Sequence, residues 1–153
     1  EEVTSRFRSQ IQAGRLSVSI AQGRMVINLP QDILFASGSA TLGSEGRRTV
    51  AAVAEVLSAI EGREFQVEGH TDDDAISTAE FPSNWELSAA RALSVVKLLV
   101  DNGVEPEQLS GAGYGEFDPV ADNESPQGKR LNRRIEIVML PNLNVIGDAS
   151  SER

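Results

Sequence analysis

The sequence predicts a mixed α/β (α+β) domain, a two-layer sandwich in which two main helices pack against one mixed β-sheet. Three observations lead to this fold class. Several short segments alternate apolar and polar residues, two longer segments repeat apolar residues at helical spacing, and the elements follow the order ββαβαβ with a last strand. The domain is expected to span residues 15–141, after an N-terminal helix or linker over 1–14 and before a polar tail over 142–153.

The first two strands are predicted to form a hairpin. Leu16, Val18 and Ile20 alternate with serines, which is the pattern of a half-buried strand. Gln22-Gly23 is a turn signal, and a second strand follows over 25–29 before Pro30 closes it. The segment 33–40 then reads as a loop rich in small residues.

Two helices follow, separated by a strand over 65–68. The first is predicted over 46–60 and is ended by Gly62. The second begins at Ser83, because the stretch 83–86 (SNWE) matches a capping box. Its expected apolar stripe is Ala89, Ala92, Leu93, Val96, Leu99 and Val100.

The last third of the chain contains two further predicted strands. The first covers 109–115 (LSGAGYG), whose glycines are expected to permit close packing. A polar loop over 116–128 follows, then a cluster of four basic residues within 129–134, and finally the closing strand over 134–140.

The candidate site lies between the strand at 65–68 and the second helix. Thr71 and Asp72 leave the strand end, where open α/β sheets place their ligands. Asn84, Leu87 and Arg91 share one helical face, because residues at i, i+3 and i+7 line up, and that face looks back at the loop. A carboxylate beside a guanidinium suits a small zwitterion, with Asp72 taking an ammonium and Arg91 a carboxylate. A direct Asp72–Arg91 ion pair that ties the loop to the helix is the structural alternative.

Composition narrows the possible functions. The chain has 153 residues, of which 40% are hydrophobic and 24% charged, as in ordinary globular domains. A formal net charge of −9 argues against a nucleic-acid-binding protein. Cysteine is absent, which excludes disulfides and thiolate sites. No apolar run approaches the ~20 residues needed to span a bilayer.

Nothing in the sequence predicts an enzyme, a cofactor or a metal. His70 is the only histidine, whereas a catalytic zinc site ordinarily has three protein ligands. No GxSxG nucleophile motif is present, and GAGYGE is not followed by a helical pattern. Counting acids leaves a paired-carboxylate glycoside hydrolase open. His70 is expected to be structural and to orient the loop.

Four motifs, in order along the chain, resemble those of OmpA-like peptidoglycan-binding domains: GHTDDD, SNWELSAARALSVVKLL, LSGAGYGEFDPVADN and GKRLNRRIEIVML. The resemblance covers roughly residues 33–140, and the form FPSNWELSAARA is most similar to MotB-type flagellar stator proteins. It implies that Asp72 and Arg91 hold the ammonium and carboxylate at the D-centre of meso-diaminopimelate in the stem peptide, with Asn84 as a further hydrogen-bonding residue. It also places Ser37 and Ser39 near the ligand, although turn chemistry explains both. The corresponding basic stretch borders the groove, so Arg133 or Arg134 is expected to steady the site; a membrane-surface or nucleic-acid role is the alternative.

The resemblance implies a non-catalytic protein that anchors a membrane protein to the cell wall in the periplasm. Peptidoglycan is the expected partner, and a homodimer would gain from multivalency. The membrane anchor is expected upstream of this chain. The alternatives are a tether of the outer membrane, as in OmpA or lipoproteins, an envelope hydrolase acting on the same polymer, and a protein–protein adaptor in which Asp72 and Arg91 are structural.

Overall fold

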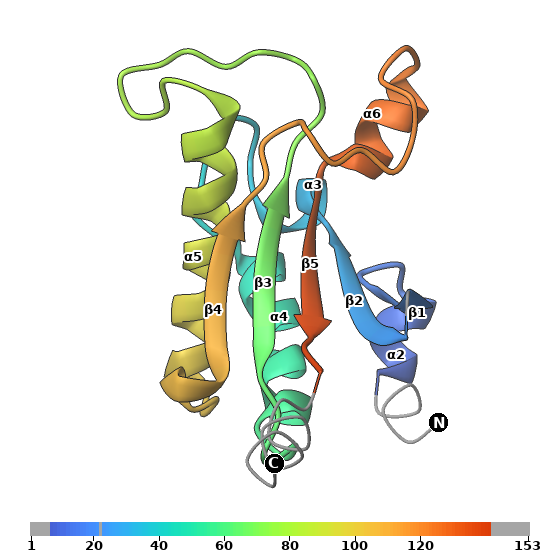
Figure 1. Ribbon diagram of the computed structural model, residues 1–153, viewed down its shortest axis with the longest axis vertical. Helices are drawn as coiled ribbons and strands as arrows, with labels where there is room; N and C mark the ends of the chain where they lie inside the picture. Colours follow the sequence, from blue (N-terminus) through green and yellow to red (C-terminus); the bar gives the residue numbers. More distant parts are fainter. Residues whose placement is uncertain (1–6, 22, 142–153) are drawn as a thin grey trace, which may run out of the picture.

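A computed structural model describes residues 7–21 and 23–141 of the chain as helices on one face of a five-stranded sheet (Figure 1). The strand order is β1-β2-β5-β3-β4, in which only β3 and β4 are parallel. The mixed two-layer α/β architecture expected from the sequence is therefore confirmed. Within the described ranges, no helix is both long enough and apolar enough to cross a bilayer.

Two connections are long, namely residues 71–83 between β3 and α5 and residues 114–125 between β4 and α6. In chain order the elements are α2 (Arg8–Gln12), β1 (Ser17–Ala21), β2 (Arg24–Pro30), α3 (Gln31–Leu34), α4 (Ser44–Leu57), β3 (Phe65–His70), α5 (Asn84–Asp101), the 3-10 helix η1 (Pro106–Gln108), β4 (Leu109–Gly113), α6 (Pro126–Asn132) and β5 (Arg134–Met139). The predicted strands and both main helices are present, with boundaries shifted by one to three residues.

Helix α5 begins where the capping box predicts. Ser83 is the N-cap, and its hydroxyl accepts a hydrogen bond from the Trp85 amide at 3.2 Å and contacts the Glu86 carboxylate. The expected apolar stripe is partly wrong, because Leu93 is 47% exposed whereas Val95 and Leu98 are buried. Helix α5 packs against α4 as well as against the sheet. Its buried face therefore includes Val95 and Leu98 and differs from the predicted stripe.

Two glycines let α5 approach the sheet at backbone distance. A Cβ atom on Gly69 of β3 would lie 2.1 Å from the carbonyl oxygen of Ser88, and one on Gly113 of β4 would lie 2.6 Å from the amide nitrogen of Ala89. Neither position tolerates a side chain without moving the helix. This packing, which the glycine-rich pattern predicts for β4, seats the N-terminal turns of α5 beside the ends of β3 and β4.

Two short helices, α3 and α6, differ from the expectations, whereas α2 lies within the helix or linker expected over residues 1–14. Residues 31–34 form α3 rather than part of a loop, and α6 lies where a polar loop was expected. Ser125 and Pro126 predict α6 in retrospect, because Ser125 is an N-cap whose hydroxyl accepts from the Gly128 amide at 3.0 Å. Helix α2 carries the buried Phe7 into the core, so this part of the predicted N-terminal segment packs on the domain. The predicted tail over 142–153, residues 1–6 and residue 22 of the hairpin turn lie outside the described residues.

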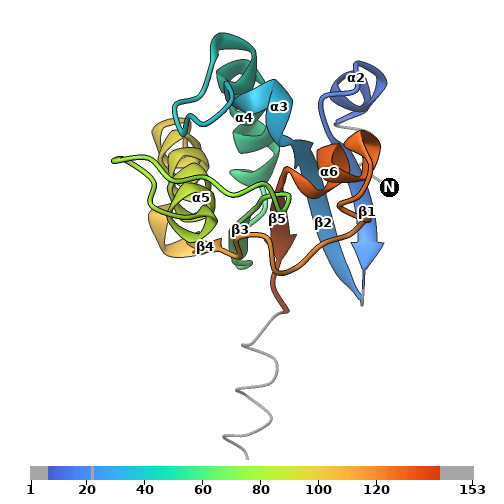
Figure 2. The ribbon, with the colours of Figure 1, turned by 90° about the horizontal axis from the view of Figure 1, so that it is seen from above.

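The topology brings four chain segments to one end of the sheet. Strands β2 and β3 both end there and β5 begins there, since Pro30 and His70 are each paired with Arg134. The segments that follow β2 and β3, the residue before β5 and the start of α5 therefore meet above this edge (Figure 2).

Candidate functional site

A cavity of about 610 Å³ lies at this end of the sheet. Its wall comes from residues 31–38, residues 71–76, the first turns of α5 and Arg133. Seven residues singled out from the sequence line it, namely Ser37, Thr71, Asp72, Asn84, Leu87, Arg91 and Arg133. Ser39 contributes its carbonyl group instead of its side chain, and His70 and Arg134 do not line the cavity.

Arg91 is a buried guanidinium held by neutral groups. Its side chain belongs to α5, is 4% exposed and lies with its guanidinium carbon 5.3 Å from the ring centroid of Phe35. The Nε atom donates to the Ser39 carbonyl at 2.8 Å, and Nη1 donates to Gln31 Oε1 at 2.7 Å. Among the described residues Arg91 makes no ion pair, so a direct Asp72–Arg91 pair is not formed. Burial lowers the pKa of Arg91 to about 10, which still leaves it positively charged at neutral pH.

Asp72 is paired with Arg133, not with Arg91. Its Oδ2 atom lies 2.7 Å from Arg133 Nη1, and its Oδ1 atom accepts from the Asp74 amide at 3.0 Å. Arg133 also forms a fork onto Asp32, with Nε 3.2 Å from Oδ1 and Nη2 3.0 Å from Oδ2. The hydrogen bonds that Arg133 donates to Asp32 and Asp72 raise the pKa of Arg133 above its usual value. Arg133 therefore bridges the segments after β2 and β3.

Asn84 fixes the backbone of the loop that carries Asp72. Its Nδ2 atom lies 3.0 Å from the Asp74 carbonyl and 3.0 Å from Glu116 Oε1. The Thr71 hydroxyl donates to the Asp72 carbonyl at 2.7 Å, and the Thr71 amide donates to the Gly115 carbonyl at 2.9 Å. The carboxylate of Asp72 is therefore held in place by its own backbone as well as by Arg133.

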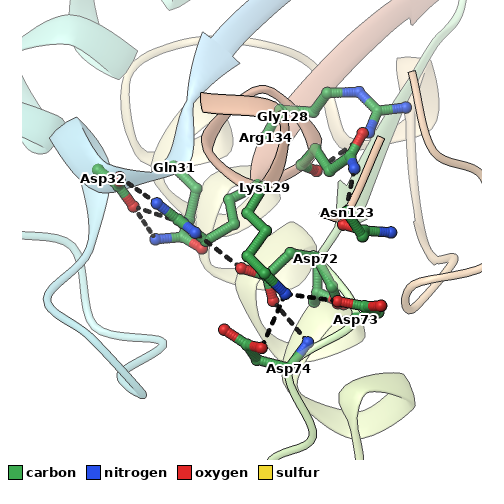
Figure 3. A network of polar contacts seen from close by, with 12 residues as sticks. Gln31, Asp32, Asp72, Asp73, Asp74, Asn123, Gly128, Lys129 and Arg134 are labelled. Atoms are coloured by element: carbon green, nitrogen blue, oxygen red, sulfur yellow. Dashed lines mark hydrogen bonds and ion pairs between the residues drawn. The ribbon is translucent and has the colours of Figure 1, made fainter. Parts of the chain in front are cut away.

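Helix α6 holds the next part of the loop from outside the cavity. Lys129 Nζ lies 2.7 Å from Asp73 Oδ1 and 2.9 Å from Asp74 Oδ1 (Figure 3). The two carboxylates raise the pKa of Lys129 above its usual value. Lys129 and Arg133 are four residues apart and face the same loop, so the basic cluster neutralises the acidic segment 72–74.

His70 and Arg134 lie on the sheet face away from α4 and α5, so neither side chain reaches the cavity directly. Strand residues alternate in direction, and their neighbours Gly69 and Ile135 point to the helices. His70 stacks on Tyr114 at 4.8 Å and contacts Glu68 at 3.2 Å. Arg134 Nε donates to Glu136 Oε2 at 2.6 Å.

The group of Glu68, His70 and Glu136 on this face has ligand atoms within 4.8 Å of one another, a spacing found in metal sites. Arg134 already donates to Glu136, however, and so provides the positive charge that a cation would bring.

Sequence reasoning missed Gln31, Asp32 and Phe35. All three follow β2 and reach the cavity only through the long-range pairing of β2 with β5. Gln31 is buried and provides the acceptor that orients Arg91. Local spacing carried no signal for them, since the nearest sequence cue was Pro30, which marks only the end of a strand.

The cavity combines charges of both signs at fixed places. Asp32, Asp72 and Asp74 contribute carboxylates, and Arg91 and Arg133 contribute guanidinium groups. Of these two guanidinium groups, Arg133 is paired with carboxylates, whereas Arg91 has no carboxylate partner among the described residues. Such a site is suited to a small ligand with a carboxylate for Arg91 and an ammonium for the acidic side.

Comparison with known proteins supports the resemblance. The OmpA family model matches residues 34–133. The chain is 34% identical to Motility protein B of Bacillus subtilis (strain 168) over 83% of this chain and 49% of that protein. It is also 34% identical to the "Probable lipoprotein YiaD" of Escherichia coli (strain K12), over 90% of this chain and 61% of that protein. The chain thus spans about half to three-fifths of the length of these relatives.

Solved structures agree with the sequence comparison. A MotB-like protein from Desulfovibrio vulgaris superimposes with a TM-score of 0.84 at 29% identity, covering 90% of this chain and 86% of that chain. The cell wall anchor of the T6SS from Pseudomonas aeruginosa gives a TM-score of 0.83 at 35% identity, covering 90% of this chain and 96% of that chain. From its motifs, its sheet topology and these matches, the chain belongs to the OmpA family and has the fold of MotB periplasmic domains.

Proposed function

We propose that this domain binds peptidoglycan without catalysis, through the meso-diaminopimelate residue of the stem peptide. The D-centre of that residue carries an ammonium and a carboxylate on one carbon. Arg91 binds the carboxylate, Asp72 binds the ammonium, and Asn84 holds the Asp72 loop at the rim. The cavity volume of about 610 Å³ accommodates a side chain of this size.

The observation that carries this proposal is that Arg91 has no carboxylate partner within residues 7–21 and 23–141. A buried cation without an anionic partner is costly, and the burial that lowers its pKa to about 10 is the sign of that cost. Guanidinium groups have five N–H donors, of which Arg91 directs one to Ser39, one to Gln31 and a long one to Ala36 at 3.5 Å. Donors therefore remain for an incoming carboxylate, which would supply the missing negative charge.

Asp72 retains acceptor capacity for an ammonium. An ionised carboxylate offers about four acceptor positions, and Arg133 and the Asp74 amide occupy two of them. Because Arg133 is also bonded to Asp32, it can share Asp72 with a ligand and keep an anionic partner.

The relatives support a role in attachment. A solved structure at 35% identity is that of a cell wall anchor. The similarity to Motility protein B covers 83% of the present chain. We infer that the domain ties a membrane protein to the wall in the periplasm, with the membrane anchor upstream of this segment and with two copies acting together. A polar ligand of this size binds modestly, so a dimer facing a cross-linked wall gains through multivalency.

A tether of the outer membrane is the second candidate, and one observation favours it. The similarity to the Escherichia coli lipoprotein covers 90% of this chain, which is more than the similarity to Motility protein B covers. Both candidates use the same wall site and differ in the anchor. The identity of the upstream segment, a transmembrane helix or a lipidated cysteine, separates them.

Co-sedimentation with purified diaminopimelate-type peptidoglycan tests the binding function. The unaltered chain is expected in the pellet, and Asp72→Ala and Arg91→Ala in the supernatant. Asp101→Ala is the matched control, since Asp101 is exposed at the far end of α5. Circular dichroism of each variant reports on the fold. Equal sedimentation of all four chains would show that the named site is wrong, and release of soluble muropeptides would instead indicate a hydrolase.

A further inference from the structure

Two aromatic side chains stack on each other at the surface close to the cavity. Trp85 lies in the first turn of α5, and Phe117 lies in the connection between β4 and α6. Their ring centroids are 5.1 Å apart with an angle of 25° between the planes. Trp85 is 51% exposed and Phe117 is 63% exposed. Contiguous exposed apolar surfaces on soluble proteins are candidate interaction sites, and stacked aromatic rings are one form that they take.

The backbone beneath the two rings is fixed. Gly115 has a φ of 62°, and a Cβ atom there would lie 3.4 Å from Phe117 and 3.6 Å from Trp85. The Gly115 amide donates to the Ser88 hydroxyl at 3.0 Å, and its carbonyl accepts from the Thr71 amide at 2.9 Å. The rings therefore rest on a turn that is bonded to both α5 and the end of β3, so the surface is preorganised.

The aromatic pair is joined to the cavity wall by a single side chain. Asn84 lines the cavity and precedes Trp85, and Glu116 precedes Phe117. The amide nitrogen of Asn84 is 3.0 Å from the carboxylate of Glu116 and 3.0 Å from the carbonyl of Asp74. Seen from above, the segment between β3 and α5 separates the side of α3 from the side of the β4–α6 connection (Figure 2). Through Asn84 and Glu116 the pair is thus connected to the cavity wall.

We propose that Trp85 and Phe117 form a platform for a sugar ring of the glycan strand whose stem peptide occupies the cavity; this inference rests on the proposed function. The face of an aromatic ring carries negative charge, and the C–H groups on one face of a pyranose are its complement. Glu86 and Glu116 are next in sequence to Trp85 and Phe117, and their carboxylates can accept hydrogen bonds from sugar hydroxyls. In the stem peptide an alanyl and a γ-linked glutamyl residue separate diaminopimelate from the glycan, and the diaminopimelate side chain adds to this length, so the peptide is longer than an extended α-linked dipeptide of roughly 7 Å. That reach fits a sugar platform one side chain beyond the cavity wall.

Charge argues against two other ligands for this surface. Glu86, Glu116 and Asp118 are beside or next in sequence to the two rings, and the chain has a formal net charge of −9. An anionic lipid surface or a nucleic acid would be repelled by them. A neutral sugar carries no such penalty.

The test uses two probes that differ only in the sugar. One is the tripeptide L-alanyl-γ-D-glutamyl-meso-diaminopimelate, and the other is the same tripeptide on the N-acetylglucosaminyl-N-acetylmuramyl disaccharide. Trp85 is the only tryptophan of the chain, so its fluorescence reports directly on the platform. The unaltered chain is expected to bind the disaccharide probe roughly three- to tenfold more tightly than the tripeptide, which is the range of one aromatic stacking contact. Only the disaccharide probe should shift the Trp85 emission strongly.

The variants Trp85→Ala and Phe117→Ala are expected to bind both probes equally, at the tripeptide affinity of the unaltered chain. Calorimetry gives the affinities for Trp85→Ala, and Phe117→Ala retains the fluorescent residue. Leu131→Ala is the matched control, because Leu131 is 62% exposed on α6 and should keep the preference for the disaccharide.

The possible failures are distinguishable. If the unaltered chain binds both probes equally, or if the preference survives in both aromatic variants, the platform is refuted while the peptide site stands. If the unaltered chain binds neither probe, the proposed function fails and the platform fails with it. A second copy of the chain could also cover the two rings, and sedimentation velocity without ligand tests this. If the unaltered chain is a dimer and Trp85→Ala is a monomer, the rings pack against the second copy and the sugar platform is refuted.

Discussion

Replacing Asp72 with Asn separates the binding role of this carboxylate from its structural role. The substitution keeps the shape of the side chain and removes its charge, which weakens the contact of 2.7 Å to Arg133. Arg133 is not left without an anion, because it remains bonded to Asp32 at 3.0 and 3.2 Å. The loss should cost roughly 1–2 kcal/mol, since Arg133 is partly exposed. For a domain of this size Tm should then fall by roughly 2–8 °C.

The effect of Asp72→Asn on ligand binding should be larger. An ammonium that loses a charge-assisted hydrogen bond loses about 1.5–3 kcal/mol, which weakens affinity roughly 10- to 150-fold. The assay is isothermal titration with the diaminopimelate-containing tripeptide, and differential scanning calorimetry gives Tm of each variant.

Asp73→Asn is the matched control for this experiment. It removes the same charge one residue along the chain, from an exposed side chain that pairs with Lys129 and does not line the cavity. Its affinity should change less than about fivefold, as expected of an exposed pair. If Asp73→Asn weakened binding as much as Asp72→Asn, the general negative charge of the loop would explain the effect. If Asp72→Asn bound like the unaltered chain, the assignment of the ammonium to Asp72 would be refuted.

Three further predictions follow from the same contacts. Arg91→Lys should fold but bind the tripeptide about tenfold more weakly by calorimetry, because a point charge replaces a fork; unchanged affinity would contradict the role of Arg91. Lys129→Met should weaken tripeptide binding less than about fivefold by loosening residues 73–74, and the loss should shrink at 0.5 M salt, where the pair is screened; a loss independent of salt would contradict this. Burial by itself raises the pKa of Glu68, but hydrogen bonds from His70 and Gln66 leave it below its usual 4.5. Because the folded-state pKa lies below the unfolded value, ionised Glu68 stabilises the fold above pH 4.5, and this contribution disappears as pH falls through the folded-state pKa. Glu68→Gln should therefore be less stable than the unaltered chain in urea at pH 7 and approach it at pH 3.5; an equal difference at both pH values would contradict the reasoning.

Much of the framework could be predicted because its signals are local. The alternation in β1 and β3 and the cap at Ser83 depend on neighbours within a few residues, and these elements are present in the structure. The common face of Asn84, Leu87 and Arg91 follows from helical spacing alone, and all three line the cavity.

What could not be predicted depends on contacts between distant segments. Gln31 lies 60 residues from Arg91, and their hydrogen bond exists only because β2 ends beside β5 and β3. The pairing of Asp72 with Arg133 spans 61 residues and displaced the simpler expectation that Asp72 faces Arg91. The sheet face of Arg134 could have been predicted, because successive side chains of a strand point to opposite faces and Ile135 was expected in the core.

The central claim is that the cavity recognises an ammonium and a carboxylate on one carbon, and a single titration tests it most directly. The unaltered chain is titrated with the tripeptide L-alanyl-γ-D-glutamyl-meso-diaminopimelate and, separately, with the same tripeptide carrying L-lysine at the third position. Lysine lacks the carboxylate that Arg91 would bind, and its ammonium is not held next to one. The account predicts binding of the diaminopimelate peptide that is at least about 100-fold tighter, from two charge-assisted contacts. Equal affinity for the two peptides would contradict it.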